Sequence, residues 1–340
     1  MKKSWFYTLF TAAMFGAMTV CTAAPNLYPV VVNNRWGFVN KSGETVINPQ
    51  FDRAEVFAEG LAPVKMGRWG YVDGSGKVAI NPQFDRADEF SEGLAAVKLG
   101  GGGPVPYDPR PFSPIRGGGG RYGYINSEGK YIINPQFDDA GSFSDGLAPV
   151  KMGKWGYIDK SGKVLINPQF DEANSFSDNL ALIKSGGRFG YTDKEGKLAI
   201  NPQFERALPF SEGLAAVRSG GKWGFVDKTG KLVINPQFED AGSFVKGLAP
   251  AREGKRWGFL NPAGKFVINA EFDDAGAFSE GLVPVRQSGH WGFVDKSGKF
   301  VVNAQFDEAA SFTNGLARVK VGGRTGYIDA SGKYIWNPAK

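Results

Sequence analysis

The chain has 340 residues, among them 48 glycines, 20 prolines and 27 phenylalanines. This much glycine and proline suits a protein with many tight turns and argues against a mainly helical one. The single histidine and single cysteine leave little material for a metal site or a nucleophilic triad, so we predict no catalytic residue, no metal and no cofactor. The net charge of +6 hints only weakly at a polyanionic partner, and we expect no nucleic-acid binding.

The first 23 residues have the layout of a secretory signal peptide. Lys2 and Lys3 precede an apolar run over residues 5–20, and small residues follow. We place the cut after Ala23, so that residues 24–340 form the mature chain. The protein is then expected to be periplasmic or extracellular, without a membrane span in the mature chain.

Lipid anchoring at Cys21 is disfavoured, because Met18-Thr19-Val20 lacks the small residue that normally precedes a lipidated cysteine. Cleavage after Ala23 leaves the mature chain without a cysteine and thus without disulfides. It also removes two of the 40 basic residues, so the net charge falls to about +4 against 34 acidic residues.

An aromatic residue followed by glycine recurs along the mature chain every 33 or 34 residues, with one step of 53. Self-similarity at such a period points to one repeat array rather than to several globular domains. A ninth, decayed copy is Thr325-Gly326. We interpret the aromatic members as a structural column packed in the core: Trp36, Trp69, Tyr122, Trp155, Phe189, Trp223, Trp257 and Trp291.

Each copy contains three strand-length runs, which in the fourth copy cover 147–151, 154–159 and 163–166. They are rich in β-branched and aromatic residues and are bounded by glycine or proline. The link between the second and third runs has an aspartate first and a glycine three residues later, which is typical of a three-residue hairpin closed by a left-handed glycine. The unit is therefore predicted to be a three-stranded antiparallel meander.

After the third run, Asn167-Pro168 is expected to end the strand, because proline has no N–H to donate. The connector that follows carries Phe170, Ala173 and Phe176, and their equivalents recur at the same spacing. We interpret these residues as plugs that pack one unit against the next.

Both faces of each small sheet are largely apolar, so each sheet should be covered on both sides. Stacked neighbours in an all-β array of nine three-stranded units meet this need. We favour a closed, β-propeller-like ring, because closure also protects the strand edges. An open β-solenoid is the alternative, since the array starts with a first strand and ends with a third, so that no unit is split between the termini. Three strands per blade would also be fewer than the usual four of a propeller, unless the connector at 170–176 adds one.

The block Lys/Arg-Trp-Gly-Tyr/Phe-Ile/Val-Asp-x-x-Gly-Lys, followed by Ile-Asn-Pro-Gln-Phe-Asp-x-Ala and Phe-Ser-Glu-Gly-Leu-Ala, resembles the bacterial WG-repeat (KWG-repeat) family. The resemblance covers essentially the whole mature chain. Departures are the replacements of tryptophan at Tyr122, Phe189 and Thr325, and of proline at Ala270 and Ala304. It implies an exported β-rich repeat protein and carries over no catalytic or binding residue.

Charged residues also recur in columns. Basic residues precede the aromatic-glycine pair, as at Arg35 and Lys154, and a second basic column ends the first strand, as at Lys151. An acidic column, with Asp52 and Asp171 among its members, matches them. We interpret these columns as paired charges between neighbouring units; the alternative is a positive track for an anionic polymer. His290 stands at a basic-column position.

Residues 99–120 break the pattern with a glycine- and proline-rich insertion between the first and second strands of the third copy. Such composition favours an extended, mobile loop. The loop is the candidate partner-binding segment, because a feature confined to one copy can give the array individuality. Its candidate contact residues are Tyr107, Arg110, Phe112 and Arg116.

The sequence thus predicts a monomeric exported scaffold without enzymatic activity that mediates protein–protein interaction at the cell envelope. No motif for a hydrolase, a phosphate-binding loop or a calcium site occurs. The alternative function is lectin-like binding of an envelope glycan or an anionic polymer through the aromatic or basic columns.

Overall fold

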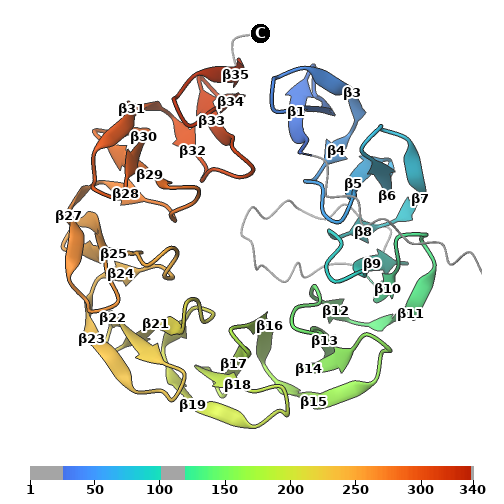
Figure 1. Ribbon diagram of the computed structural model, residues 1–340. Coiled ribbons are helices and arrows are strands. Elements are labelled where there is room, and N and C mark those ends of the chain that lie inside the picture. The colour runs from blue at the N-terminus through green and yellow to red at the C-terminus, as the bar shows by residue number, and fades with distance from the viewer. Residues whose placement is uncertain (1–25, 101–118, 338–340) are drawn as a thin grey trace, which may run out of the picture.

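A computed structural model describes residues 26–100 and 119–337, and this part of the chain is built from β-strands. The strands form nine small antiparallel sheets that stand side by side as the nine blades of a β-propeller (Figure 1). The first and last blades contact each other, so the ring is closed. The favoured propeller is therefore confirmed, and the open solenoid is excluded.

Blade 1 consists of β1–β3, and blades 2 to 9 each take the next four strands in order. The innermost strands are β4 (Arg53–Ala54), β8 (Arg86–Ala87), β12 (Asp139–Ala140), β16 (Glu172–Ser177), β20 (Arg206–Ala207), β24 (Asp240–Ala241), β28 (Asp274–Ala275) and β32 (Glu308–Ala309). The second strands are β1 (Tyr28–Val32), β5 (Leu61–Met66), β9 (Ala95–Leu99), β13 (Leu147–Met152), β17 (Leu180–Ser185), β21 (Leu214–Ser219), β25 (Ala249–Glu253), β29 (Leu282–Gln287) and β33 (Ala317–Val321).

The third strands carry the aromatic-glycine pairs, and the outermost strands form the circumference. The third strands are β2 (Arg35–Val39), β6 (Arg68–Asp73), β10 (Arg121–Ile125), β14 (Lys154–Asp159), β18 (Arg188–Thr192), β22 (Lys222–Asp227), β26 (Arg256–Leu260), β30 (His290–Asp295) and β34 (Arg324–Ile328). The outermost strands are β3 (Thr45–Phe51), β7 (Val78–Phe84), β11 (Tyr131–Phe137), β15 (Val164–Phe170), β19 (Leu198–Phe204), β23 (Leu232–Phe238), β27 (Phe266–Phe272), β31 (Phe300–Phe306) and β35 (Tyr334–Trp336).

The connector between copies supplies a strand that the three-stranded unit lacks. In blade 4, Asp139 and Ala140 pair with Lys151 and Val150 of β13 and form the innermost strand β12. An equivalent innermost strand occurs in blades 2 to 9, longer in blade 5 (β16, Glu172–Ser177), so these blades have four strands. The meander itself is confirmed, but the blade begins in the connector of the preceding copy.

Asn167-Pro168 does not end the outermost strand, contrary to the sequence prediction. Strand β15 continues to Phe170, and its pairing with β14 shifts register across the proline. Pro168 is tolerated because it lies in this irregular stretch of an edge strand, where no regular ladder bond requires its missing N–H. The strand therefore ends at Phe170, two residues after the proline.

The glycine of the aromatic-glycine pair faces this irregular stretch. In blade 4, Trp155 pairs with Phe170 while Tyr157 pairs with Ile166, so the backbone of 167–169 bulges against Gly156. A Cβ on Gly156 would lie 2.4 Å from the Ile166 carbonyl oxygen. Seven other blades repeat this close approach. Glycine is needed at this position because there is no space for a Cβ. In the tight turns glycine is needed for a different reason, because the backbone there has a positive φ.

Blades are held together by an aromatic contact that recurs around the ring. The ring of Tyr157 in β14 packs 5.0 Å from that of Phe176 in blade 5, and its hydroxyl donates to the Asn174 carbonyl oxygen at 2.8 Å. Both rings are buried, together with Phe170 at the end of β15. Phe170 and Phe176 thus act as the predicted plugs between units.

Between blade 9 and blade 1 a different residue provides the aromatic contact. Tyr28 of β1 packs 5.5 Å from Tyr327 of β34, and its hydroxyl donates to the Asn314 carbonyl oxygen at 2.6 Å. The Tyr327 hydroxyl donates in turn to the Pro29 carbonyl oxygen at 2.8 Å. A tyrosine from the second strand therefore takes the place of the connector phenylalanine, and among the described residues the ring closes by packing.

The close approach at Gly156 gives a direct test of this fold. Replacing Gly156 by alanine should lower the free energy of unfolding by about 2–3 kcal/mol, because the added methyl group meets fixed backbone atoms. Urea denaturation followed by tryptophan fluorescence would measure the change. The matched control is Gly153→Asn in the adjoining turn, where φ is +73° and no heavy atom lies within 4 Å. Asparagine tolerates that conformation, so equal losses in the two variants would contradict the packing argument.

Candidate functional site

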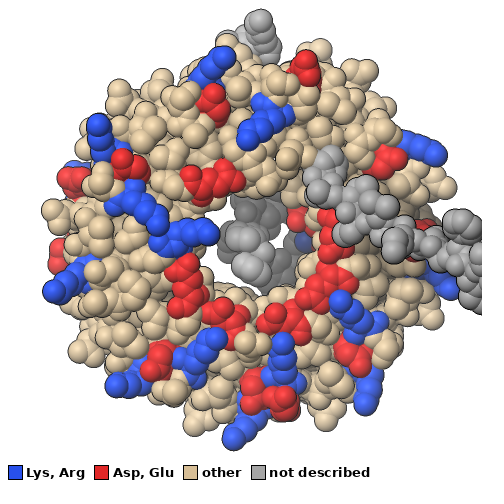
Figure 2. Space-filling view, viewed as in Figure 1, with Lys and Arg blue, Asp and Glu red and all other residues tan. Residues whose placement is uncertain are grey.

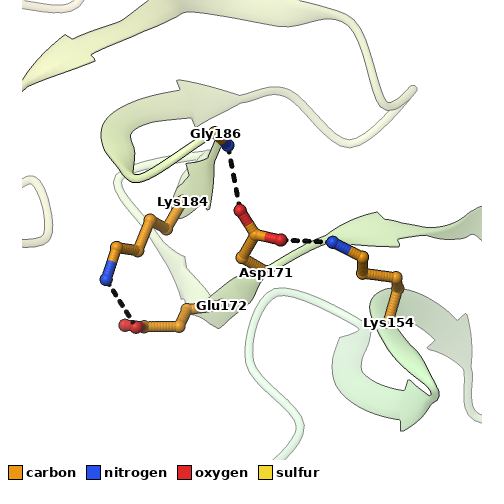
Figure 3. Close-up of polar contacts among 5 residues, drawn as sticks. All are labelled: Lys154, Asp171, Glu172, Lys184 and Gly186. Carbon is orange, nitrogen blue, oxygen red and sulfur yellow. Dashed lines mark hydrogen bonds and ion pairs between the residues drawn. The ribbon is translucent and has the colours of Figure 1, made fainter.

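On one face of the ring, the paired charges predicted from the sequence form clasps between blades. Asp171, in the link from blade 4 to blade 5, accepts a hydrogen bond from the Lys154 ammonium on β14 (Figure 3). Its second carboxylate oxygen accepts the N–H of Gly186, in the β17–β18 turn of blade 5, at 2.9 Å. The hydrogen bond from Lys154 holds the pKa of Asp171 below its ordinary value. One carboxylate thus joins two blades.

The same arrangement recurs around this face, and we call it the carboxylate clasp. The ion pairs are Arg35–Asp52, Arg68–Asp85, Arg121–Asp138, Lys154–Asp171, Lys222–Glu239 and Arg256–Asp273. His290, the histidine of the sequence, stands exposed at the corresponding position in blade 8. Exposed pairs of this kind each contribute little to stability, because solvent screens them. The prediction of paired charges between units is confirmed, and these basic side chains are engaged in holding the ring.

The opposite face carries the loops between innermost and second strands, and their acidic residues surround the central opening (Figure 2). We call this set the acidic rim: Glu59, Glu92, Asp145, Asp178, Glu212 and Glu280. Lys246 and Asn314 stand at the equivalent positions in blades 7 and 9. These residues recur with the period of the repeat, but the acidic rim was not predicted from the sequence.

Most acidic-rim carboxylates also bind the next blade. Glu92 accepts the N–H of Gly146 at 3.1 Å and pairs with the Lys160 ammonium at 3.2 Å, both in blade 4. Glu212 likewise accepts the N–H groups of Lys246 and Gly247 in blade 7. The acidic rim is therefore a second set of links between blades, opposite the clasps, and its regular placement does not distinguish one blade from another.

The aromatic column lies at the edge of the core. Tyr122 and Trp223 are buried, and the remaining members are partly buried and pack against the apolar clusters between blades. Basic residues of the second strands lie over three of these rings: Lys98 over Tyr122, Lys184 over Phe189 and Arg252 over Trp257. Such contacts cover part of the ring surface that a sugar would use for stacking.

The candidate contact residues Tyr107, Arg110, Phe112 and Arg116 lie outside the residues that the structure describes. The residues that flank the 99–120 insertion show where it leaves the ring. Strands β9 and β10 keep the regular hairpin pairing up to Leu99 and Arg121. The ideal Cβ position of Gly100 lies 3.8 Å from the Gly120 Cα. The insertion therefore starts and ends at neighbouring points on the clasp face and leaves the blade intact.

Across residues 26–100 and 119–337, no helix is long and apolar enough to span a membrane. The same part of the chain holds no group of three or more histidine, cysteine, aspartate or glutamate side chains placed to bind a metal ion.

Comparison with known families identifies the repeat. The family model described as "WG containing repeat" matches eight segments: 36–68, 69–102, 122–154, 155–189, 189–223, 223–257, 257–289 and 291–324. The protein belongs to the WG-repeat family. Each matched segment starts in a third strand, so a WG repeat in sequence runs from one blade into the next. No curated protein matches the chain.

Solved structures share the propeller fold at low sequence identity. A eukaryotic initiation factor structure aligns with a TM-score of 0.61 at 10% identity, covering 91% of this chain and 95% of that one. Dihydro-heme d1 dehydrogenase NirN aligns at 0.48 and 11% identity, covering 85% and 76%. Kluyveromyces lactis Hsv2p aligns at 0.39 and 11% identity, covering 58% and 75%. The likeness to the initiation factor structure supports the fold alone. The TM-scores of the other two alignments are too low to support a conclusion about this protein.

The WG-repeat turns between third and outermost strands are built around an aspartate. Asp159 accepts hydrogen bonds from the Ser161 hydroxyl at 2.6 Å and from the N–H groups of Ser161 and Lys163. These bonds lower the pKa of Asp159, and the bond from the serine hydroxyl has the largest effect. The equivalent bonds lower the pKa of Asp227 and Asp295. Gly162 closes the turn with a φ of +86°, as the sequence predicted.

These turns make stability depend on pH in a defined direction. Because the folded pKa is lowered, the unfolded state binds more protons, so the stabilisation is present above about pH 4 and is lost as the pH falls through the lower folded value. The triple variant Asp159→Asn, Asp227→Asn and Asp295→Asn should lose less stability between pH 7 and pH 3 than the natural protein. Denaturation midpoints at both pH values would show it.

Two turns of the natural chain provide the matched control. Asn126 and Asn261 already occupy this position and hold their turns with the side-chain oxygen. The double variant Asn126→Asp and Asn261→Asp should therefore steepen the acid dependence. Identical pH profiles in all three proteins would show that the turn carboxylates do not contribute.

Proposed function

We propose that this WG-repeat propeller is an exported, non-catalytic scaffold that binds a protein partner at the cell envelope. The observation that carries the proposal is the contrast between the repeated polar residues and the insertion. The clasps and the acidic rim use their charged groups to join successive blades. The segment 99–120 is set apart, because it occurs in one blade and is inserted into a hairpin whose strands pair regularly up to Leu99 and Arg121.

Export is proposed from the basic, apolar and small-residue segments of residues 1–23. An extracytoplasmic protein without disulfides depends on packing and turn geometry for its stability, and the buried rings between blades supply this packing. The insertion offers the partner two arginines and two aromatic residues in a proline-rich segment: Arg110, Arg116, Tyr107 and Phe112. Arginine and aromatic side chains are enriched among residues that dominate protein interfaces.

The experiment is affinity capture from envelope extract with chemical crosslinking. The bait is the mature chain, and the comparison bait has residues 100–120 replaced by Gly-Gly, the turn of blade 6 at Gly220-Gly221. A partner captured by the first bait should be lost from the second, while the circular dichroism spectrum stays unchanged.

A finer control keeps the length of the loop and changes four side chains: Tyr107→Ser, Arg110→Gln, Phe112→Ser and Arg116→Gln. This variant should reduce capture at least tenfold. Equal capture of the same partners by all baits would overturn the assignment of the binding site to the insertion. If none captures a protein partner, the scaffold function itself fails.

Glycan binding is the second candidate, favoured by the partial exposure of Trp36 and Trp155 on the third strands. Sedimentation with peptidoglycan at low salt tests it. Binding that persists when residues 100–120 are removed and is lost in Trp155→Ala would favour the glycan function over the scaffold.

A further inference from the structure

In most blades a charged pair joins the innermost strand to the second strand. The first residue of the innermost strand lies directly opposite a basic residue near the end of the second strand. Among the described blades, five carry opposite charges at these positions: Asp139–Lys151, Glu172–Lys184, Asp240–Arg252, Asp274–Arg286 and Glu308–Lys320. In blade 5 the Lys184 ammonium lies 2.9 Å from the Glu172 carboxylate (Figure 3). Opposite charges in this arrangement stabilise a sheet, and like charges destabilise it.

Three blades place two positive charges at these positions. The pairs are Arg53–Lys65 in blade 2, Arg86–Lys98 in blade 3 and Arg206–Arg218 in blade 6. Blades 2 and 3 have an acid two residues after the arginine, Glu55 and Asp88, and the Asp88 carboxylate lies 3.0 Å from Arg86 Nε. Blade 6 has Leu208 at this position. The like-charge pair of blade 6 therefore lacks the acid that accompanies the other two.

The carboxylate clasp between blades 5 and 6 is changed as well. Its acid, Glu205, accepts the N–H of Gly221 at 3.2 Å, as the other clasp acids accept a turn N–H. Its carboxylate, however, lies 3.9 Å from Nε of Arg218 in the same blade. Within the described part of the chain, no ion pair joins Glu205 to Arg188, the clasp residue of blade 5. One carboxylate is therefore shared by a sector that contains three arginines, with Arg206 as the third.

These arginines have hydrogen-bond donors to spare. Arg188 and Arg206 are exposed, and among the described residues neither side chain forms an ion pair or a hydrogen bond. Arg218 is half-buried and donates through Nε to the Gly221 carbonyl oxygen at 3.1 Å, which leaves its terminal nitrogens for another acceptor. Two guanidinium groups thus lie on adjacent strands where blade 5 holds an ammonium and a carboxylate.

We propose that Arg206 and Arg218 bind a tetrahedral oxyanion with two negative charges, a phosphate or sulfate group, with Arg188 at the margin of the site. The anion lies beside the basic residue of the second strand, as the Glu172 carboxylate does in blade 5. The planar guanidinium fork matches two oxygens of such a group. Two positive charges without a nearby acid favour a dianion over a singly charged anion. This site goes beyond the proposed scaffold function and does not depend on it.

Equilibrium dialysis with labelled inorganic phosphate tests the site in a chain comprising residues 24–340. Low ionic strength is used because salt screens exposed charges. We expect binding with a dissociation constant on the order of 1 mM. Arg206→Gln and Arg218→Gln should each weaken it at least tenfold, because each removes a charge-assisted contact. The matched control is Lys228→Gln, which removes one charge from an exposed turn of blade 6 on the opposite face and should leave binding unchanged.

Two further variants separate binding from folding. Arg206→Glu restores the opposite charges of the other blades, so it should raise the urea midpoint in chloride buffer and abolish phosphate binding. Glu172→Arg makes the reverse change in blade 5, where Asn174 stands two residues later instead of an acid. This variant should gain a second phosphate site.

Competing anions define the ligand and its source. Sulfate should displace phosphate, and acetate at the same ionic strength should compete at least tenfold less well, because it carries one charge. Glucose 6-phosphate and glucose separate a free phosphate from one attached to a larger molecule. Tighter binding of the ester than of inorganic phosphate would assign the site to an attached group, and tighter binding of inorganic phosphate would assign it to the free ion.

Three results would overturn the proposal: no phosphate binding by the natural protein, equal binding by the natural protein and Arg206→Glu, or an equal loss in Lys228→Gln and Arg206→Gln. The last result would show that phosphate responds only to the overall charge. Loss of this site leaves the scaffold proposal intact, because affinity capture depends on residues 100–120 and not on blade 6.

Discussion

The contact between an aromatic ring of one blade and a phenylalanine of the next is the interaction on which the structure depends. Tyr157 against Phe176 is one instance, and both side chains are almost fully buried. Removing a buried phenylalanine costs about 3–5 kcal/mol, which exceeds the contribution of any surface ion pair on the ring. Because each blade is apolar on both faces, it is stable only between two neighbours, as in other repeat proteins.

This requirement also explains why the array closes. A row of nine blades would leave an apolar face exposed at each end, and a ring leaves none. The repeat register places Ala23 where the other blades have the connector phenylalanine, so closure needs another aromatic residue from blade 1. Tyr28 supplies the ring from the second strand and secures it with its hydroxyl. The carboxylate clasps and the acidic rim then fix the spacing of the blades on the two faces.

Much of the fold could be predicted from the sequence because the same pattern of turn, strand and core residues recurs in each repeat. The aspartate and glycine of the hairpin, the spacing of Phe170 and Phe176 and the matching charge columns all indicated what the structure shows. Pro168 led to a wrong prediction of where the outermost strand ends, because the effect of a proline on hydrogen bonding depends on whether its strand lies at an edge. The repeat unit was predicted with three strands and the connector left open as the source of a fourth, because two residues such as Asp139-Ala140 carry no strand pattern of their own.

The candidate site was harder to predict for a physical reason. Clasps and acidic rim become visible only when residues from successive blades are brought together, as with Glu92 and Lys160, which are 68 positions apart. Once these charges are assigned to contacts between blades, individuality remains where the ninefold pattern is broken. The insertion at 99–120 breaks it on the clasp face.

The closed ring is the central claim, and a distance between blades 9 and 1 tests it most directly. Lys41 and Asn314 stand at the same repeat positions as Lys160 and Glu92, which join blades 3 and 4 through a 3.2 Å ion pair. Spin labels on cysteines introduced at 41 and 314 of a chain comprising residues 24–340, which has no other cysteine, should give the same short, narrow distance distribution as labels at 160 and 92. A long or broad distribution for 41 and 314, with a short one for 160 and 92, would show that the array is open.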